Sequence, residues 1–171
     1  VLSRVIQGAR ISMKIVAYAL IAGTAVGMSM GIIAGYFGGW TDELIMRLVD
    51  LWLGLPFLLI AIVVAVVLGA SETTVLFLLL LIAWVGFVRQ VRADVLVLRT
   101  RDYVDAARIA GASTLRILWK HIVPGTLGTV MILASLRVGG LILAEASLSF
   151  LGVGIPDPIP AWGKSVNEGR E

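Results

Sequence analysis

Long apolar stretches alternate with short charged ones along this chain. Residues 15–40 and 51–71 contain no Asp, Glu, Lys or Arg. About twenty apolar residues in a helix cross a hydrocarbon core of about 30 Å, so each stretch is long enough to span a membrane. Two further stretches of the chain are nearly as apolar. The pattern predicts an all-α, polytopic bundle with spans at about residues 15–37, 51–70, 72–88 and 122–144.

Composition supports the membrane assignment. Hydrophobic residues make up 59% of the chain and charged residues 15%, whereas soluble domains average about half apolar and a quarter charged. The net charge is +3, and seven of the 14 Lys and Arg residues lie within residues 89–125. Because basic residues collect in cytoplasmic loops of membrane proteins, this clustering needs no nucleic-acid partner to explain it. The chain has no cysteine and one histidine, which excludes disulfides and thiolate chemistry and leaves little basis for a metal site.

The chain divides into a lead-in and one transmembrane unit. Residues 1–14 mix three basic residues with apolar ones and are expected to lie at the interface as an amphipathic segment. Residues 15–171 are expected to form a partial transmembrane domain, with a cytoplasmic loop at 89–121 and an outer, proline-rich segment at 146–163. The first residue is not Met and the last residues are polar, so we interpret the chain as a fragment of a larger membrane protein.

Four glycines recur at every fourth position in the first span. Gly23, Gly27, Gly31 and Gly35 therefore share one helix face. Small residues at this spacing allow two membrane helices to approach closely. We predict a helix–helix seam along this face, although glycine is also common in membrane helices in general.

The segment that follows is expected to turn and begin a new helix. Gly38 and Gly39 signal the turn, and Thr41 can cap a helix that starts at Asp42. Pro56 should kink the apolar stretch that continues this helix. Arg89 is expected to end the third span.

The loops predict the orientation. The connection at 71–73 has no basic residue, whereas the loop that begins at Arg89 has seven, so this loop should be cytoplasmic. Residues 35–50 are then inside, and residues 1–14 begin outside. The three basic residues of the lead-in oppose this orientation, but the asymmetry of seven against none should dominate.

The basic loop itself contains two expected short helices. The first covers residues 102–110, with Thr100 or Asp102 as its cap and small alanines on one face. Gly111 should end it in the left-handed conformation. The second covers residues 114–121, capped by Ser113. Its expected inward side chains are Leu115, Leu118 and Trp119, and its expected outward ones are Arg116 and Lys120.

One charge lies inside the last span. Arg137 is about 20 Å beyond Pro124 at 1.5 Å per residue, and an intramembrane charge is a functional candidate by default. It could face a translocation path and meet an acidic substrate group, or it could pair within the bundle or reach outward to the interface. Glu145 is about 12 Å further along the same helix, too far for a direct ion pair, and is the second candidate for the path.

The basic loop also carries a family motif. The permease subunits of ABC importers share a cytoplasmic pattern of EAA, three residues, G, nine residues and then I-x-L-P. The chain has Asp105-Ala106-Ala107, then Gly111, then His121-Ile122-Val123-Pro124 at the same spacing. It departs from the pattern at Asp105, His121 and Val123. The HIVP sequence resembles the HILP of the dipeptide, oligopeptide and nickel branch, in which an Asn often follows where this chain has Gly125.

Two other stretches are similar to the same branch. GYFGGWTDELIMRLVD, residues 35–50, resembles its loop after the second span, and LSFLGVGIPDPIPAWG, residues 148–163, resembles its segment after the fifth. The resemblance implies a type I importer permease of six helices, of which this chain holds about spans two to five. It further implies a multi-pass protein of the bacterial or archaeal plasma membrane.

The resemblance also implies partners and roles. Asp105, Ala106, Ala107, Gly111 and Pro124 match the motif that docks onto a separate ATPase. The chain should therefore contain no catalytic residue and no cofactor or metal site, and it has no Walker A loop, so ATP and Mg should bind the ATPase subunits. Further partners would be a second permease subunit, in a heterodimer by the tendency of the family, and an extracytoplasmic substrate-binding protein.

The substrate stays open between dipeptides, longer peptides and a related solute such as nickel. The alternative function is an ion-coupled secondary transporter, which would require carboxylates at mid-span and broken helices in paired positions. The acidic residues here lie at or near the span ends, which disfavours that alternative. A purely structural membrane scaffold would explain the spans but not the spacing of the loop motif.

Overall fold

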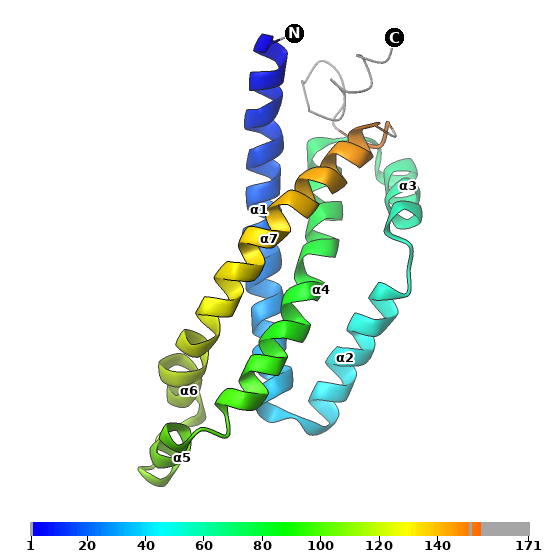
Figure 1. Ribbon diagram of the computed structural model, residues 1–171. Helices are drawn as coiled ribbons and strands as arrows, with labels where there is room; N and C mark the ends of the chain where they lie inside the picture. Colours follow the sequence, from blue (N-terminus) through cyan, green and yellow to red (C-terminus); the bar gives the residue numbers. More distant parts are fainter. Residues whose placement is uncertain (1, 151, 155–171) are drawn as a thin grey trace.

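The computed structural model describes residues 2–150 and 152–154, and within this part every regular element is helical (Figure 1). Three helices are long and apolar enough to cross a membrane, or four if the bent pair α2–α3 counts as one span. The helices are α1 (Leu2–Phe37), α2 (Gly39–Leu53), α3 (Phe57–Leu68), α4 (Glu72–Leu98), α5 (Asp102–Ile109), α6 (Thr114–Ile117) and α7 (Val123–Phe150), with a π-helical turn, Leu118–Ile122, between α6 and α7.

Two helices continue past the boundaries expected from the sequence. Helix α1 runs through the predicted lead-in without a break at Ile15, because no proline interrupts it. Helix α4 continues for ten residues beyond Val88, so the expectation that Arg89 ends the span is wrong. Arg89 and Arg92 stay in the helix because each pairs with an aspartate of α2, which removes the reason for the chain to leave the bundle at that point. Helix α7 likewise extends to Phe150, six residues past the expected end at 144.

The second span is broken rather than kinked. Helices α2 and α3 meet at 82° across residues 54–56, and Pro56 occupies the N-cap position of α3. Proline has no N–H to donate and disfavours helical conformation in the residue before it. The helix therefore ends before Pro56 and a new one begins after it, where only a kink was predicted. Helix α2 begins at Gly39, with Gly38 at φ 66° before it and no side-chain cap, so the predicted Thr41 cap is wrong.

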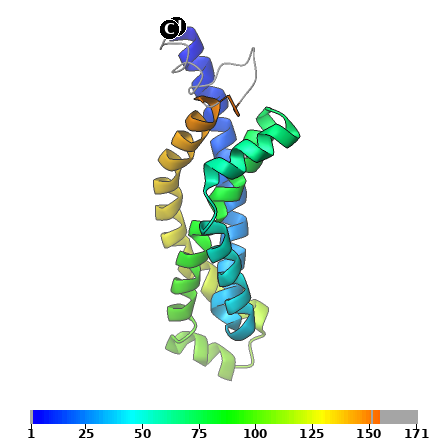
Figure 2. The same cartoon turned by 90° about the vertical axis from the view of Figure 1, so that its right-hand side faces the viewer.

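The predicted glycine seam is confirmed, and its partner is α4. The two helices make the most extensive contact in the structure and run side by side (Figures 1 and 2). A Cβ on Gly27 would lie 2.3 Å from the carbonyl oxygen of Trp84, and one on Gly31 would lie 2.8 Å from that of Val88. These distances are too short for any side chain, so the absence of one is what lets the two backbones meet.

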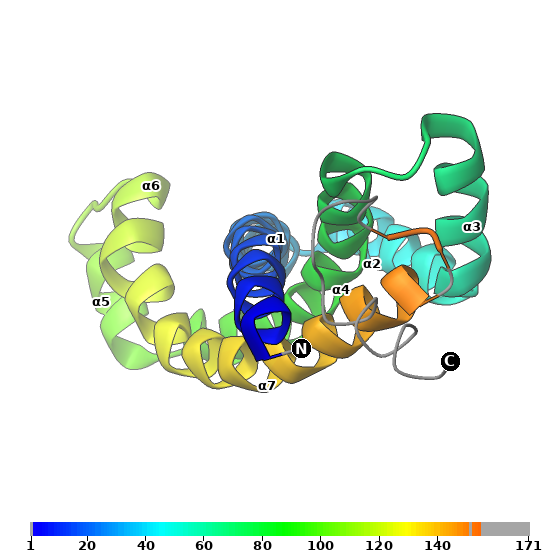
Figure 3. The same cartoon turned by 90° about the horizontal axis from the view of Figure 1, so that it is seen from above.

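Helix α7 crosses this pair obliquely, and the short helices lie at one end of the bundle. Seen from above, α5 and α6 lie to one side of α1 and α3 lies to the other (Figure 3). The turn between α1 and α2 is at the same end of the bundle as α5 and α6, whereas the start of α1 and the connection into α4 are at the opposite end (Figure 1). This arrangement agrees with the alternation of loops predicted from the charges.

A π-helical turn joins the short helices to the last span. Pro124 is the second residue of α7, as predicted for its place in a first turn, but α6 and α7 are continuous in direction through the turn. A proline inside a continuing helix removes one hydrogen bond, and its ring crowds the preceding turn. The N–H of Val123 bonds the carbonyl of Leu118 across five residues, and this widening leaves room for the ring.

Candidate functional site

Helix α5 presents the motif at the end of the bundle. The predicted helix is confirmed at Asp102–Ile109, although Arg101, rather than Thr100 or Asp102, occupies the cap position and no side chain caps it. Asp105 and Ala106 are exposed, Ala107 is half-buried and Val104 is fully buried against the core. Gly111 adopts φ 76°, the left-handed conformation predicted for it. The small side chains therefore form an exposed surface on a helix whose opposite face is buried through Val104.

The second short helix buries a different face from the one that the sequence pattern predicted. Leu115 and Trp119 were expected to point inward, but they are 67% and 69% exposed, and the inward residues are Ile117 and Ile122. The physical reason is the π turn, which changes the angular step between residues and so rotates the face that the sequence pattern predicted. Ser113 precedes the helix as expected, but its side chain makes no capping hydrogen bond.

These changes leave an apolar surface around the motif. Ile109 is 89% exposed, and Leu115 and Trp119 are exposed in the same loop as the motif alanines. Large apolar side chains in such a polar loop are characteristic of protein–protein contact. Tyr103 of α5 and His121 of the π turn lie with ring centroids 5.7 Å apart, so α5 contacts the π turn through the histidine of the motif.

Two arginines tie this surface to the end of α1. Arg99 Nη1 donates hydrogen bonds to the carbonyl oxygens of Gly35 at 2.9 Å and Tyr36 at 3.3 Å. The last carbonyls of a helix have no partner within it, so Arg99 supplies the missing donor and its charge suits the negative helix end. The guanidinium of Arg108, which also pairs with Asp105 at 2.9 Å, lies 5.9 Å from the Tyr36 ring centroid.

Replacing Arg99 by alanine should therefore loosen the motif surface. We expect a loss of about 1.5–3 kcal/mol in the free energy of unfolding, the usual worth of hydrogen bonds to a charged donor. Arg101→Ala is the matched control, because Arg101 is exposed and its side chain makes no hydrogen bond within the described part of the chain. Thermal unfolding of the full-length permease in detergent measures both variants, and equal unfolding temperatures would contradict the assigned role.

Ion pairs join α2 to α4 at the same end. The carboxylate of Asp42 accepts from both Nε and Nη2 of Arg92, with 2.6 Å for the second bond. Asp50 pairs with Arg89, which lies one turn before Arg92 in α4. The first pair is partly buried and bidentate, which holds α2 at a defined angle, whereas the second is exposed and contributes less.

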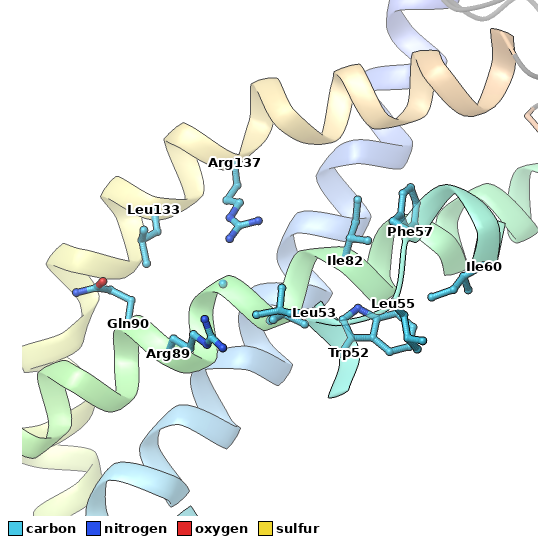
Figure 4. A pocket seen from close by; sticks show the side chains of 12 residues that line it. Trp52, Leu53, Leu55, Phe57, Ile60, Ile82, Arg89, Gln90, Leu133 and Arg137 are labelled. Atoms are coloured by element: carbon cyan, nitrogen blue, oxygen red, sulfur yellow. The ribbon is translucent and has the colours of Figure 1, made fainter. Parts of the chain in front are cut away.

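The intramembrane arginine lies in a pocket between three segments. Arg137 and Leu133 of α7 face Gly86 and Gln90 of α4 across a cavity of about 540 Å³, whose third wall is the junction of α2 and α3 (Figure 4). Within the described residues Arg137 has no ion-pair partner, so the sequence-based alternative of a carboxylate partner in the bundle has no support there.

Glu145 lies elsewhere. It is fully buried, its Oε1 accepts a hydrogen bond from Ser149 Oγ at 2.9 Å, and its other carboxylate oxygen has no hydrogen-bond partner within the described structure. It is not among the residues that line the pocket around Arg137. The structure therefore separates the two candidates for the translocation path, as their spacing along one helix predicted.

Several residues of these sites were missed from the sequence. Arg99, Tyr36 and the Asp42–Arg92 pair carry no local signal, because their partners are 50 or more positions apart. Gly86 did offer one, because it is the only glycine in the apolar run from Val75 to Val88, and Gln90 follows that run beside Arg89. Such interruptions on the face toward an intramembrane charge are a usable sign of a polar site.

The motif surface and the membrane bundle have known counterparts. Residues 27–170 match the model of the family described as "Binding-protein-dependent transport system inner membrane component". The chain is 37% identical over 170 residues to a protein of Pectobacterium atrosepticum named glutathione transport system permease protein GsiD. It is 41% identical over 170 residues to proteins of the same name from Escherichia coli and Shigella boydii. Each match covers 99% of this chain and 56% of the relative, so the chain spans little more than half the length of the curated relatives it matches.

The architecture of the helical bundle and the family match agree. The helical bundle with three to four apolar spans has the architecture of a multi-pass inner-membrane protein, and the family match covers most of it. The ion-coupled carrier considered from the sequence has no support in these matches. The chain belongs to the family of binding-protein-dependent transport system inner membrane components, the permease subunits of ABC importers, and within it to the dipeptide, oligopeptide and nickel branch.

Proposed function

We propose that this chain forms part of the translocation path of an ATP-driven importer for small peptides. The observation that carries the proposal is the exposed motif surface of α5 and α6, which is braced from behind by buried Val104 and by Arg99. A surface that must transmit a displacement needs such rigid support, because a loose loop would absorb the motion. The transported solute is a glutathione-like or other short peptide, in keeping with the printed names of the relatives.

The assembly that follows has several subunits. ATPase subunits dock on Asp105, Ala106, Ala107 and Gly111, and Pro124 with its π turn connects that site to α7. ATP and Mg are bound and ATP is hydrolysed on those subunits, and this chain takes no part in the chemistry. A second permease subunit, different in sequence, completes the path, and an extracytoplasmic binding protein delivers the peptide.

The proposal also assigns the parts of the chain. Residues 1–14 form the lead-in and residues 15–171 the partial permease domain, with the coupling loop at 89–121 and the outer segment at 146–163, most of which is outside the described residues. Arg137 and Glu145 are polar positions of the path at mid-depth and toward its outer end. The burial of Glu145 fits a path that is closed at that end in this conformation.

A disulfide crosslink tests the docking surface. These 171 residues contain no cysteine, so Ala106→Cys introduces the only one in this part of the permease, and any cysteine elsewhere in the full-length protein is first replaced by serine. A second cysteine is placed in the cleft of the ATPase encoded with it. We expect a crosslink whose yield changes when ATP is added, because closure of the ATPase dimer moves the docked helix.

The control is a cysteine on the same chain away from the surface. Ser71→Cys lies at the connection into α4, at the opposite end of the bundle from α5, and should give no crosslink (Figure 1). If Ala106→Cys gives none either, although the complex assembles, the docking role is wrong. ATP-dependent uptake of labelled glutathione and of alanyl-alanine then tests the transported solute separately.

A further inference from the structure

Arg137 sits near the middle of helix α7. It is 14 residues beyond the first residue of α7 and 13 before the last. At 1.5 Å per residue it is therefore about 20 Å from either end of this helix. Gly86, which faces it, precedes Arg89 by one turn of α4. A guanidinium inside a membrane-spanning helix is costly unless it is solvated or paired.

Among the described residues that line the pocket, none is a carboxylate that could neutralise Arg137. Arg89 also lines the pocket, and its partner Asp50 is not a lining residue. Glu145 is buried elsewhere and bonded to Ser149. The one uncharged polar side chain that lines the pocket is Gln90, whose amide offers further hydrogen-bond donors (Figure 4).

A glycine makes room for the arginine head group. A Cβ on Gly86 would lie 1.7 Å from Arg137 Nη2 and 2.4 Å from its Cζ. The guanidinium thus rests directly on the backbone of α4 and points into the pocket instead of reaching toward a membrane surface. Apart from Arg89, which pairs with Asp50, the remaining wall is apolar and aromatic and includes Trp52, Phe57, Ile60 and Leu133.

We propose that this pocket is a carboxylate subsite of the translocation path, in which Arg137, seated on Gly86, binds the free terminal carboxylate of a short peptide. Gln90 supports the same group, and the apolar wall accommodates a peptide side chain. A volume of about 540 Å³ falls within the range of about 300–1,000 Å³ typical of small-molecule sites. The inference rests on the proposed function and adds the chemical feature of the solute that the path reads.

Uptake of matched peptides tests the subsite. The full-length complex is reconstituted in proteoliposomes with its binding protein, and the solutes are alanyl-alanine, alanyl-alanine amide, glutathione and glutathione ethyl ester. Peptide concentrations are set so that the binding protein is loaded to the same fraction with each. The quantity compared is the ratio of the uptake rate of each peptide with a free C-terminal carboxylate to that of the derivative in which this group is blocked.

Arg137→Gln should lower this ratio by about 10- to 100-fold, the factor expected for losing a hydrogen bond to a charged group. Uptake of the amide should fall much less than uptake of the free acid, because the amide offers no terminal carboxylate for Arg137 to bind. Gly86→Ala should lower the ratio as well, because a methyl group there displaces the guanidinium head. Gly139→Ala is the matched control, since no atom of the described structure lies within 4 Å of a Cβ at that position.

Charge rescue separates binding from a structural role. Arg137→Cys, in a complex whose other cysteines are replaced, is treated with aminoethyl methanethiosulfonate, which attaches an ammonium group, or with methyl methanethiosulfonate, which attaches a neutral one. Recovery of the ratio with the first reagent and not with the second is the expected result.

Three results would overturn the subsite. An unchanged ratio in Arg137→Gln would show that the arginine does not read the carboxylate. An equal loss of both peptides, or a complex that fails to assemble, would show that Arg137 pairs with a carboxylate of the second permease subunit. If the wild-type complex drives ATP-dependent uptake of none of the four solutes, the proposed function fails and the subsite fails with it.

Discussion

Gly27→Val should prevent α1 from packing on α4 and leave little folded permease. A Cβ at this position would meet the Trp84 carbonyl oxygen at 2.3 Å and the Phe87 Cβ at 2.7 Å. The first obstacle is backbone, which cannot rotate away, so the helices must separate along the whole seam. Overpacking that flexible side chains can absorb costs about 1–3 kcal/mol, and an obstacle made of backbone should cost at least the upper figure.

The matched pair is alanine at two glycines. Gly27→Ala faces the obstacle just described, whereas Gly128→Ala in α7 has no atom of the described structure within 4 Å of its new Cβ. The temperature at which half of the detergent-solubilised, full-length protein loses its monodisperse peak in size-exclusion chromatography reports the difference. We expect a fall of several degrees for Gly27→Ala, a change near zero for Gly128→Ala and no recoverable peak for Gly27→Val. Equal behaviour of the two alanine variants would show that the seam does not determine the packing.

Gly111→Glu should uncouple transport from ATP hydrolysis. Gly111 adopts φ 76°, where a residue with a side chain costs about 1–2 kcal/mol. No atom of the described residues lies within 4 Å of a Cβ built there, so a side chain has room at this turn between α5 and α6. It would add a negative charge to the docking site beside exposed Ile109 and Leu115. We expect ATP-driven peptide uptake to fall at least about tenfold while the ATPase subunits continue to hydrolyse ATP.

Asparagine at the same position separates the effect of the left-handed conformation from the effect of the added negative charge. Asn tolerates the left-handed conformation and carries no charge, so Gly111→Asn should retain most of the uptake if the surface is what matters. Uptake in proteoliposomes and phosphate release from the same preparation are measured together. Wild-type uptake by the Gly111→Glu variant would remove Gly111 from the docking role.

Gly27 and Gly111 thus lie in two parts of the chain that are rigidly connected. The α1–α4 seam makes a rigid pair of spans, and Arg99 joins the end of α1 to the segment that leads into α5. Val104 of α5 is buried in the same apolar cluster as Ile32 of α1 and Phe87 of α4. A displacement of α5 is therefore transmitted to both long helices. Rigid coupling of this kind is required if domain closure in a partner is to change the packing of spans.

Local sequence was enough to predict which stretches are apolar enough to span a membrane, the glycine face of α1 and the left-handed turn at Gly111. Each of these follows from residues that are neighbours in the chain: an apolar run, a spacing of four, or a glycine after alanines. The cluster of basic residues predicts which end of the bundle is cytoplasmic. The family motif was also recognisable, because its residues are close together in one loop.

The partners of the charged side chains, in contrast, depend on the tertiary structure. Arg89 and Arg92 remain helical because Asp50 and Asp42, 39 and 50 positions away, neutralise them. Arg137 finds its seat on Gly86 of another helix, and the π turn before Pro124 rotates Trp119 and Leu115 outward. Local sequence sets which residues can be helical or apolar. The partner of a long charged side chain depends instead on which helices pack together, and that contact is made by residues far apart in the chain.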